Sequence, residues 1–367
     1  LKGIETEILI PMEFEPDEIP DLEPPEMDPD DEWLLNLGIP PFILTKLVAF
    51  RNRQREILTE EDWEMIPRQV PFISQGNIVP RAITAFLLGE NGQDWQGILL
   101  QGRRGVAKTM LTAYLAEIFL LPWHSIPAGE GMNSETLLGS KTLDVVSHPA
   151  LNPVDMGRLH IAAQNAGIEI QSILNSCQTY SQKIVFDPGL LLKPLMNPAG
   201  ALIVLEEVNF FPWEVTALLH PALDGSKNLS VPGYGNLNIP NNVRVAATMN
   251  PGYLGTRPLN EAFSDRFCPF LMEPLPLEKM AGMLEEQSGA SSTACKKLAE
   301  IFRALYQRVE NGEVSDEVLS IRRLIRAAIA HRETGWPLRD CLQWQFSDLT
   351  DSYLRQICLD AIQAHLG

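Results

Sequence analysis

The chain has 367 residues, of which 45% are hydrophobic and 21% charged, with a formal net charge of −18 and a mean hydropathy near zero. No apolar run approaches the roughly 18 to 20 residues of a membrane span, so we expect no membrane contact. Five scattered cysteines without a CxxC pair fit reduced thiols of a cytoplasmic protein, and they argue against a disulfide frame or a zinc site. The chain begins at Leu1, which leaves room for residues upstream.

The negative charge is concentrated at the amino terminus. Residues 1–32 hold thirteen acidic side chains, one lysine and six prolines, so they carry −12 of the −18. We assign residues 1–33 to an acidic tail that is either disordered or a docking strip, because apolar residues such as Ile8 and Phe14 interrupt the acids. The remaining chain is only mildly acidic, which argues weakly against a nucleic-acid partner.

Apolar spacing predicts the first ordered elements in chain order. Helices are expected at Pro41–Ile57 and Pro80–Leu88, and a short apolar strand at Gly97–Leu100. An amphipathic helix is predicted at Lys108–Leu121. A glycine-containing loop therefore lies between a strand and the start of a helix.

This strand–loop–helix unit has the pattern of a phosphate-binding loop. Its glycines let backbone amides turn toward phosphate oxygens, and the helix start adds positive charge. The lysine is expected to reach the β- and γ-phosphates of ATP, and the threonine hydroxyl to bind Mg²⁺. The loop consists of Gly102, Arg103, Arg104, Gly105, Val106, Ala107, Lys108 and Thr109.

Three loop positions depart from the general pattern. Ala107 stands where glycine is usual, and its methyl group is tolerable if φ is negative. Arg103 and Arg104 are expected to bind phosphate, contact a neighbouring subunit or face solvent, and we favour solvent.

Two later strands end in polar residues. Ala201–Leu205 is an apolar strand followed by Glu206 and Glu207. We expect Glu206 to hold the hydrated Mg²⁺ and Glu207 to activate the attacking water. The strand Val243–Thr248 leads to Asn250, which is expected to orient that water.

Strands flanked by helices indicate a three-layer α/β P-loop NTPase core with a parallel sheet. Residues 34–275 are assigned to this domain, with an insert around 140–185. Residues 276–367 are assigned to an α-helical lid with four predicted helices: Glu278–Glu286, Ala294–Val309, Asp316–Arg332 and Asp348–Leu366.

From Val79 to Ala328 the chain resembles the AAA+ ATPases of the MoxR and CbbQ/NorQ type, which are related to dynein and midasin modules. Residues 102–109 look like the family's Walker A motif, in which alanine before the lysine is common. Residues 206–209 resemble its Asp-Glu-Ile-Asn motif, with Glu206 as the departure. Residues 247–253 resemble the sensor 1 region, which gives that role to Asn250.

The resemblance also implies residues that act between subunits. It gives the arginine finger to Arg266, with Arg257 in reserve, and the sensor 2 role to Arg322. It implies a homo-oligomeric ring, usually a hexamer, with ATP between subunits, and a client protein such as one with a von Willebrand A domain.

Three functions follow as alternatives. The first is an ATP-driven chaperone that remodels, activates or assembles a partner protein. The second is an ATP-gated scaffold with little turnover, favoured by Glu206. The third is a motor stimulated by nucleic acid, which no basic stretch with interleaved aromatics supports.

Overall fold

The computed structural model describes residues 25, 27–88, 97–129, 131–149, 153–167, 178–223, 227–250, 259–347, 349 and 351–367. The acidic residues before Pro25 and the reserve finger Arg257 lie outside this part of the chain. None of the described helices combines the length and apolar character that crossing a bilayer requires.

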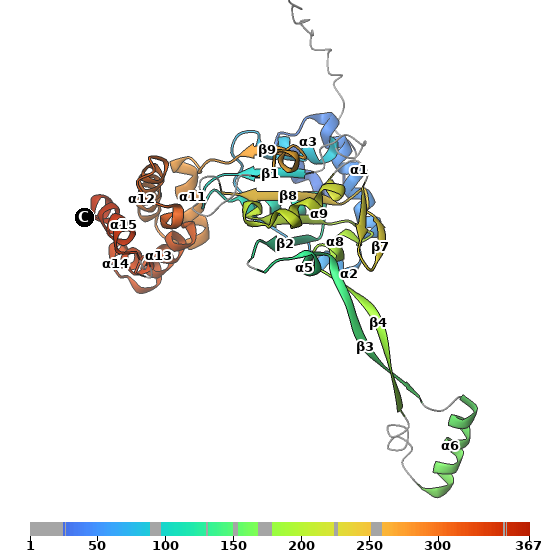
Figure 1. Cartoon of the computed structure of the whole chain (residues 1–367). Coiled ribbons are helices and arrows are strands. Elements are labelled where there is room, and N and C mark those ends of the chain that lie inside the picture. Colours follow the sequence, from blue (N-terminus) through green and yellow to red (C-terminus); the bar gives the residue numbers. More distant parts are fainter. Residues whose placement is uncertain are drawn as a thin grey trace, which may run out of the picture.

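A parallel sheet of five strands forms the centre of the larger domain, in the order β2-β5-β8-β1-β9 (Figure 1). Alternate side chains of a strand point to opposite faces, so Ile98 and Leu100 enter one apolar core and Leu99 the other. The strands are β1 (Gly97–Gln101), β2 (Trp123–Pro127), β5 (Leu202–Glu206), β8 (Arg244–Met249) and β9 (Phe267–Leu271).

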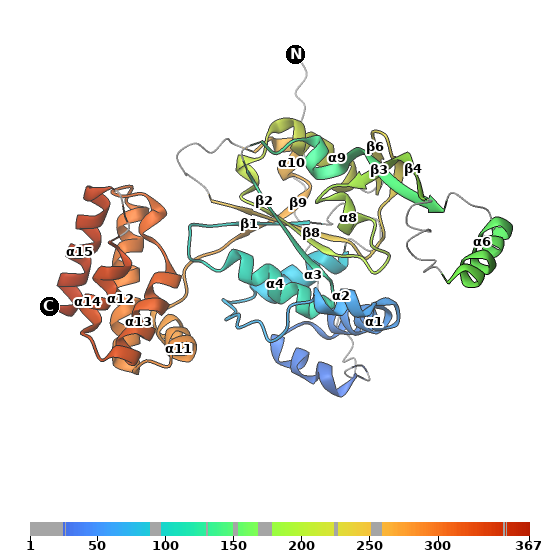
Figure 2. The same ribbon diagram turned by 90° about the horizontal axis from the view of Figure 1, so that it is seen from below.

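Helices cover both faces of this sheet. Figure 2 shows α1, α3 and α4 on one side and α9 and α10 on the other. The predicted three-layer α/β fold is therefore confirmed. The covering helices are α1 (Pro41–Ile57), α3 (Ile78–Leu88), α4 (Lys108–Phe119), α9 (Trp213–Leu223) and α10 (Glu261–Ser264), and the short ones are α2 (Glu60–Glu64), α5 (Ser134–Leu138), α8 (Leu192–Leu195) and η3 (Val208–Phe210).

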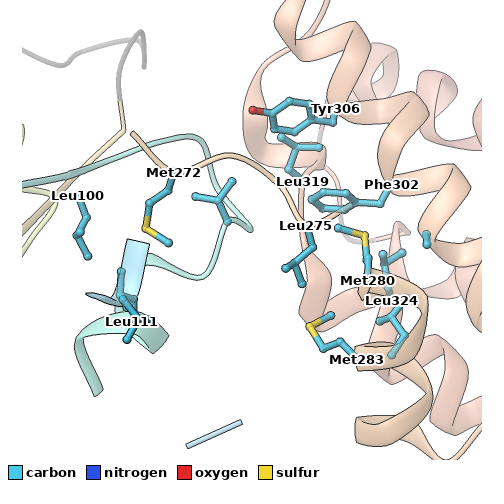
Figure 3. Packing of buried hydrophobic residues seen from close by; sticks show 14 of the residues in the cluster. Leu100, Leu111, Met272, Leu275, Met280, Met283, Phe302, Tyr306, Leu319 and Leu324 are labelled. Atoms are coloured by element: carbon cyan, nitrogen blue, oxygen red, sulfur yellow. The ribbon is translucent and has the colours of Figure 1, made fainter. Parts of the chain in front are cut away.

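The carboxyl-terminal part is helical, as predicted, and packs beside the connecting segment that follows β9. In Figure 3, Met272 of that segment lies beside Leu100 of the core, whereas Leu275 lies near Met280 and Phe302 of the helices. The elements are α11 (Leu277–Ser288), α12 (Ser292–Glu310), η4 (Asp316–Val318), α13 (Ile321–Thr334), α14 (Leu338–Gln345) and α15 (Ser352–Leu366).

One lid prediction was wrong in detail, and one helix of the lid was missed. The helix expected from Asp316 to Arg332 is interrupted, because Ser320 is extended and its side chain accepts from the N–H of Arg323, which starts a new helix there. The helix α14 was not predicted, because it has only eight residues, although its buried residues Leu338, Cys341 and Leu342 have helical spacing.

The insert is a long antiparallel ribbon with a helix at its far end (Figure 1). Strand β3 (Gly139–Pro149) pairs with β4 (Gln178–Pro188) over eleven residues, and α6 (Pro153–Ala166) follows β3. At the base, Gly139 has φ +108°, and a Cβ there would lie 2.2 Å from the carbonyl oxygen of Asp187. Only glycine allows this close approach of two backbones.

A second, smaller hairpin contacts the base of the ribbon. It consists of β6 (Asn228–Val231) and β7 (Gly235–Asn238). The ring of Tyr234, in its turn, lies 5.3 Å from that of Phe186 on β4. Because β7 leads into β8, this contact joins the ribbon to the central sheet.

The acidic tail ends earlier than predicted. Residues 29–33 belong to η1 (Pro29–Leu37), and within it Asp31 is fully buried. Its carboxylate binds Arg51 at 2.5 Å and Arg55 at 2.7 Å. The acidic composition concealed this segment, because nothing in it indicates that Asp31 pairs with the buried Arg51 and the half-buried Arg55.

This buried ion pair also supports the helix that carries the phosphate loop. Arg51 donates from Nη1 to the carbonyl oxygens of Glu117 and Ile118, which lie in the last turn of α4. Burial raises the pKa of Asp31, but hydrogen bonds from Arg55 and Arg51 outweigh it and hold that pKa below its usual value.

Replacing Asp31 with alanine should therefore lower the free energy of unfolding by about 3 kcal/mol, because it leaves buried arginine charge without its partner. Urea denaturation at pH 7 measures this, with Asp30→Ala as the control, since Asp30 is exposed. Because the pKa of Asp31 is lowered on folding, its contribution is present above about pH 4 and declines as the pH falls further. Equal stability of the two variants would contradict the role assigned to Asp31.

Candidate functional site

The predicted phosphate loop joins the carboxyl end of β1 to the start of α4. A Cβ at Gly102 would lie 2.6 Å from the carbonyl oxygen of Met272, and Gly105 has φ +79°. Both positions thus require glycine. The loop lies at the carboxyl edge of a parallel sheet, where ligands of such folds usually bind.

Ala107 corrects one expectation, because its φ is +63° rather than negative. An alanine in this left-handed conformation is strained, and such strain is concentrated at functional sites. No side chain of the described part caps α4 at Ala107, which leaves amides of its first turn for another acceptor. Free amides at a helix start are suited to phosphate oxygens.

Lys108 is held by three acceptors. Its Nζ donates to the carbonyl oxygens of Gly102 at 2.7 Å and Arg103 at 2.9 Å, and to Oδ1 of Asn250 at 2.6 Å. An ammonium has three N–H donors, so all of them are in use. Burial lowers the pKa of Lys108 to about 8, while the charges of Asp316 and Glu207 act to raise it.

Asn250 connects this lysine to the predicted general base. Its Nδ2 donates to Oε1 of Glu207 at 3.3 Å, and the N–H of Glu207 donates to Oγ1 of Thr248 at 3.1 Å. The neighbouring positions of β5, β8 and β1 in the sheet bring these groups together. Glu207 itself has φ +53°, a second strained residue at the site.

The sequence reasoning gave no role to Asn209, which supports this arrangement. Asn209 is buried, and its Nδ2 donates to the backbone oxygen of Asn250 at 3.2 Å. Its position two residues after the carboxylate pair was the available signal, although burial cannot be inferred from that position.

The two residues predicted to bind Mg²⁺ are enough for a metal whose remaining ligands are phosphate oxygens and water. Thr109 is exposed in the first turn of α4, and Glu206 ends β5. Among the described residues no group of three His, Cys, Asp or Glu side chains could hold a metal by itself. One hydroxyl and one carboxylate match the few protein ligands that Mg²⁺ takes beside a nucleotide.

The predicted arginines lie apart from this cluster. Arg266 precedes β9, whose Phe267 pairs with Gly97 while its Leu271 pairs with Gln101, the last residue before the loop. Arg266 is therefore at the opposite end of the sheet, about 13 Å or more from the loop. Its Nη1 donates to the carbonyl oxygen of Ala262.

Other arginines lie nearer the loop. Arg322 is exposed in the first turn of α13, and the adjacent Ile321 approaches Gly105, with 3.7 Å between its Cγ1 and the position of an added Cβ. Arg103 and Arg104 are half-buried rather than solvent-facing, and Arg104 has an interaction partner.

Comparison with known proteins agrees with this geometry. Residues 97–267 match the family model described as AAA domain, dynein-related subfamily. This stretch of the chain is therefore similar to an AAA domain. The loop, the carboxylate pair and β8, which ends next to Asn250, all lie inside the matched range.

Several relatives of the chain have no described function. An uncharacterised protein of Staphylococcus saprophyticus is 28% identical over 271 residues, covering 73% of this chain and 90% of its own length. The uncharacterised protein YojN of Bacillus subtilis is 27% identical over 297 residues, covering 80% and 83%. A solved structure titled as the RuvB Holliday junction branch migration motor of Thermotoga maritima has a TM-score of 0.39 and 16% identity, covering 82% and 72%. A likeness of this size carries no argument about function.

Replacing Ala107 with glycine should raise the free energy of unfolding by about 1 kcal/mol, because relief of the left-handed strain exceeds the entropic cost of glycine. Urea denaturation measures the change. Ala113→Gly, within α4, is the matched control and should lower stability by about 1 kcal/mol. A loss of stability in both variants would contradict strain at Ala107.

Nucleotide binding should be coupled to proton uptake at alkaline pH. With a pKa of about 8, more than half of Lys108 is uncharged at pH 8.5. Phosphate oxygens favour the charged form, so ATP should raise this pKa and draw in a proton. Titration calorimetry at pH 8.5 in two buffers of different ionisation enthalpy detects the uptake. Lys108→Arg, which stays charged, should show none. Identical enthalpies for the wild type in both buffers would refute the coupling.

Proposed function

We propose that the chain is an ATP hydrolase of the MoxR-type AAA+ group that forms a ring and remodels a partner protein. The observation that carries the proposal is the link through Asn250, whose amide contacts both Lys108 and Glu207. A phosphate-binding cation and a general base are thereby held at a defined separation. A phosphate loop that only binds nucleotide does not need the contact between Asn250 and Glu207.

Each residue of the cluster has a distinct part in the reaction. The amides of residues 105–109 hold the phosphates, and Lys108 exchanges its loop carbonyls for phosphate oxygens. Glu207 accepts the proton of the attacking water, which Asn250 orients. Thr109 and Glu206 would hold Mg²⁺, which would neutralise phosphate charge.

The position of Arg266 supports action between subunits. At the far end of its own sheet it cannot approach its own loop, whereas a neighbouring subunit in a ring can bring an equivalent arginine to that loop. An arginine there stabilises transition-state charge, worth roughly 10³-fold or more in rate. Arg322 completes the site from the lid. A hexamer is the ring that the resemblance favours.

The ribbon β3–β4 supports work on a partner protein. It extends away from the nucleotide domain and bears α6 at its far end (Figure 1), on which Ile161 is exposed. A client with a von Willebrand A domain is the partner type implied by the MoxR resemblance.

A low-turnover scaffold is the second candidate, favoured by Glu206. Its side chain is one methylene longer than the usual aspartate, which shifts the carboxylate relative to the metal. Measured turnover separates the two functions.

The first experiment measures steady-state ATP hydrolysis by the assembled protein. Glu207→Gln should lower turnover by roughly 100-fold or more while ATP still binds. Glu214→Gln is the control, because it makes the same charge change at an exposed position on α9. Binding without turnover in the assembled wild type would favour the scaffold, and stimulation by DNA or RNA would favour a nucleic-acid motor.

The second experiment tests action between subunits. Arg266→Ala and Lys108→Ala should each abolish hydrolysis alone. Mixing them should restore part of the activity, because an intact loop in one subunit then meets an intact arginine in its neighbour. No recovery in mixed assemblies, with exchange of subunits demonstrated, would exclude this role for Arg266.

A further inference from the structure

Two adjacent polar atoms of the lid are buried without a hydrogen-bond partner in the described part of the chain. They are Oγ of Ser315 and Oδ1 of Asp316, in the loop and η4 between α12 and α13. Asp316 is only 7% exposed. A buried carboxylate oxygen without a donor costs on the order of 1–3 kcal/mol or more, so its retention calls for a ligand.

The part of the lid next to Asp316 lies against the phosphate loop. The charge of Asp316 acts on Lys108, and it is the strongest of the carboxylate charges that do so. The neighbouring lid residues meet the loop directly, since a Cβ at Gly105 would lie 3.1 Å from Cζ of Phe302. In Figure 3, Leu319, three residues beyond Asp316, lies beside Phe302 and Leu275 at the boundary between lid and core.

Lys108 does not donate to Oδ1 of Asp316, although the charge of Asp316 acts on it. Its three N–H groups are all donated to Gly102, Arg103 and Asn250. Arg323, on the first turn of α13, donates to the backbone oxygen of Glu317 and lies over the ring of Phe346. The free oxygen of Asp316 is thus an acceptor for a group that approaches from the loop.

The chemistry of that group follows from its charge and position. A carboxylate repels phosphate oxygens at contact distance, so it does not bind the phosphates themselves. It accepts well from hydroxyl groups, and acidic side chains recognise ribose in this way in other nucleotide sites. In a nucleotide whose phosphates occupy the loop, the ribose hydroxyls are the donors nearest to them.

We infer that Ser315 and Asp316 form a ribose-recognition site on the lid, in which Asp316 accepts a hydrogen bond from a sugar hydroxyl. This inference rests on nucleotide binding as proposed above. It makes the lid, and not only the loop, a part of nucleotide recognition. The contact can form only when the lid lies against the loop, so the sugar favours that arrangement.

The test measures the dissociation constants of ADP, 2′-deoxy-ADP and 3′-deoxy-ADP by calorimetry in the presence of Mg²⁺. Diphosphates are used because they have no γ-phosphate to be hydrolysed. The wild type should bind ADP about tenfold or more tightly than the analogue that lacks the recognised hydroxyl. Asp316→Ala should reduce that ratio to about one. Glu317→Ala, an exposed neighbour on the same element, should keep the wild-type ratio.

The ratio of affinities is informative even if the variants bind more weakly overall. If Asp316→Ala does not fold, Ser315→Ala serves as a second, smaller change. It should lower the ratio of affinities partially. An unchanged ratio in Asp316→Ala, or equal binding of all three nucleotides by the wild type, would overturn the ribose site while leaving ATP binding intact. Failure of the wild type to bind any nucleotide would instead overturn the proposed function together with this inference.

Discussion

The hydrogen bond between Lys108 and Asn250 is the contact on which the rest of the site depends. It joins the loop after β1 to the end of β8, and the other side of the same amide reaches Glu207 at the end of β5. Three neighbouring strands are thereby linked at their carboxyl ends by a single side chain. Asparagine suits this position because its amide both accepts and donates, which neither aspartate nor leucine can do.

Backbone strain accompanies this arrangement on both sides. Ala107 and Glu207 both have positive φ. Ala107 directly precedes Lys108, and Glu207 is itself the proposed general base. The strain is maintained because the surrounding elements are rigid: β1, β5 and β8 are buried on both faces, and α4 is anchored through Arg51. A phosphate loop on a softer support would relax these two residues toward ordinary conformations.

Much of this could be predicted from the sequence, because the relevant signals are local. Apolar runs identified β1, β5 and β8, and the polar residues that follow each strand identified Glu207 and Asn250. The sign of φ at Ala107 could not be predicted, since it depends on how the loop closes around its contacts. The burial of Asp31 was equally hidden, because an aspartate in an acidic, proline-rich segment has no local feature that reveals its distant arginine partners. The unpartnered oxygen of Asp316 became visible only when the lid was placed beside the loop.

The ribbon β3–β4 has a mechanical consequence that follows from its length. Eleven paired residues extend about 35 Å, so a rotation of about 10° at its base would displace the far end by roughly 6 Å. The base is held by the backbone contact at Gly139 and by the rings of Phe186 and Tyr234, and the latter belongs to the hairpin that leads into β8. Because the hairpin leads into the amino end of β8, a small rotation of the ribbon at this base would be amplified at the far end into a displacement large enough to shift a bound protein segment by more than one residue.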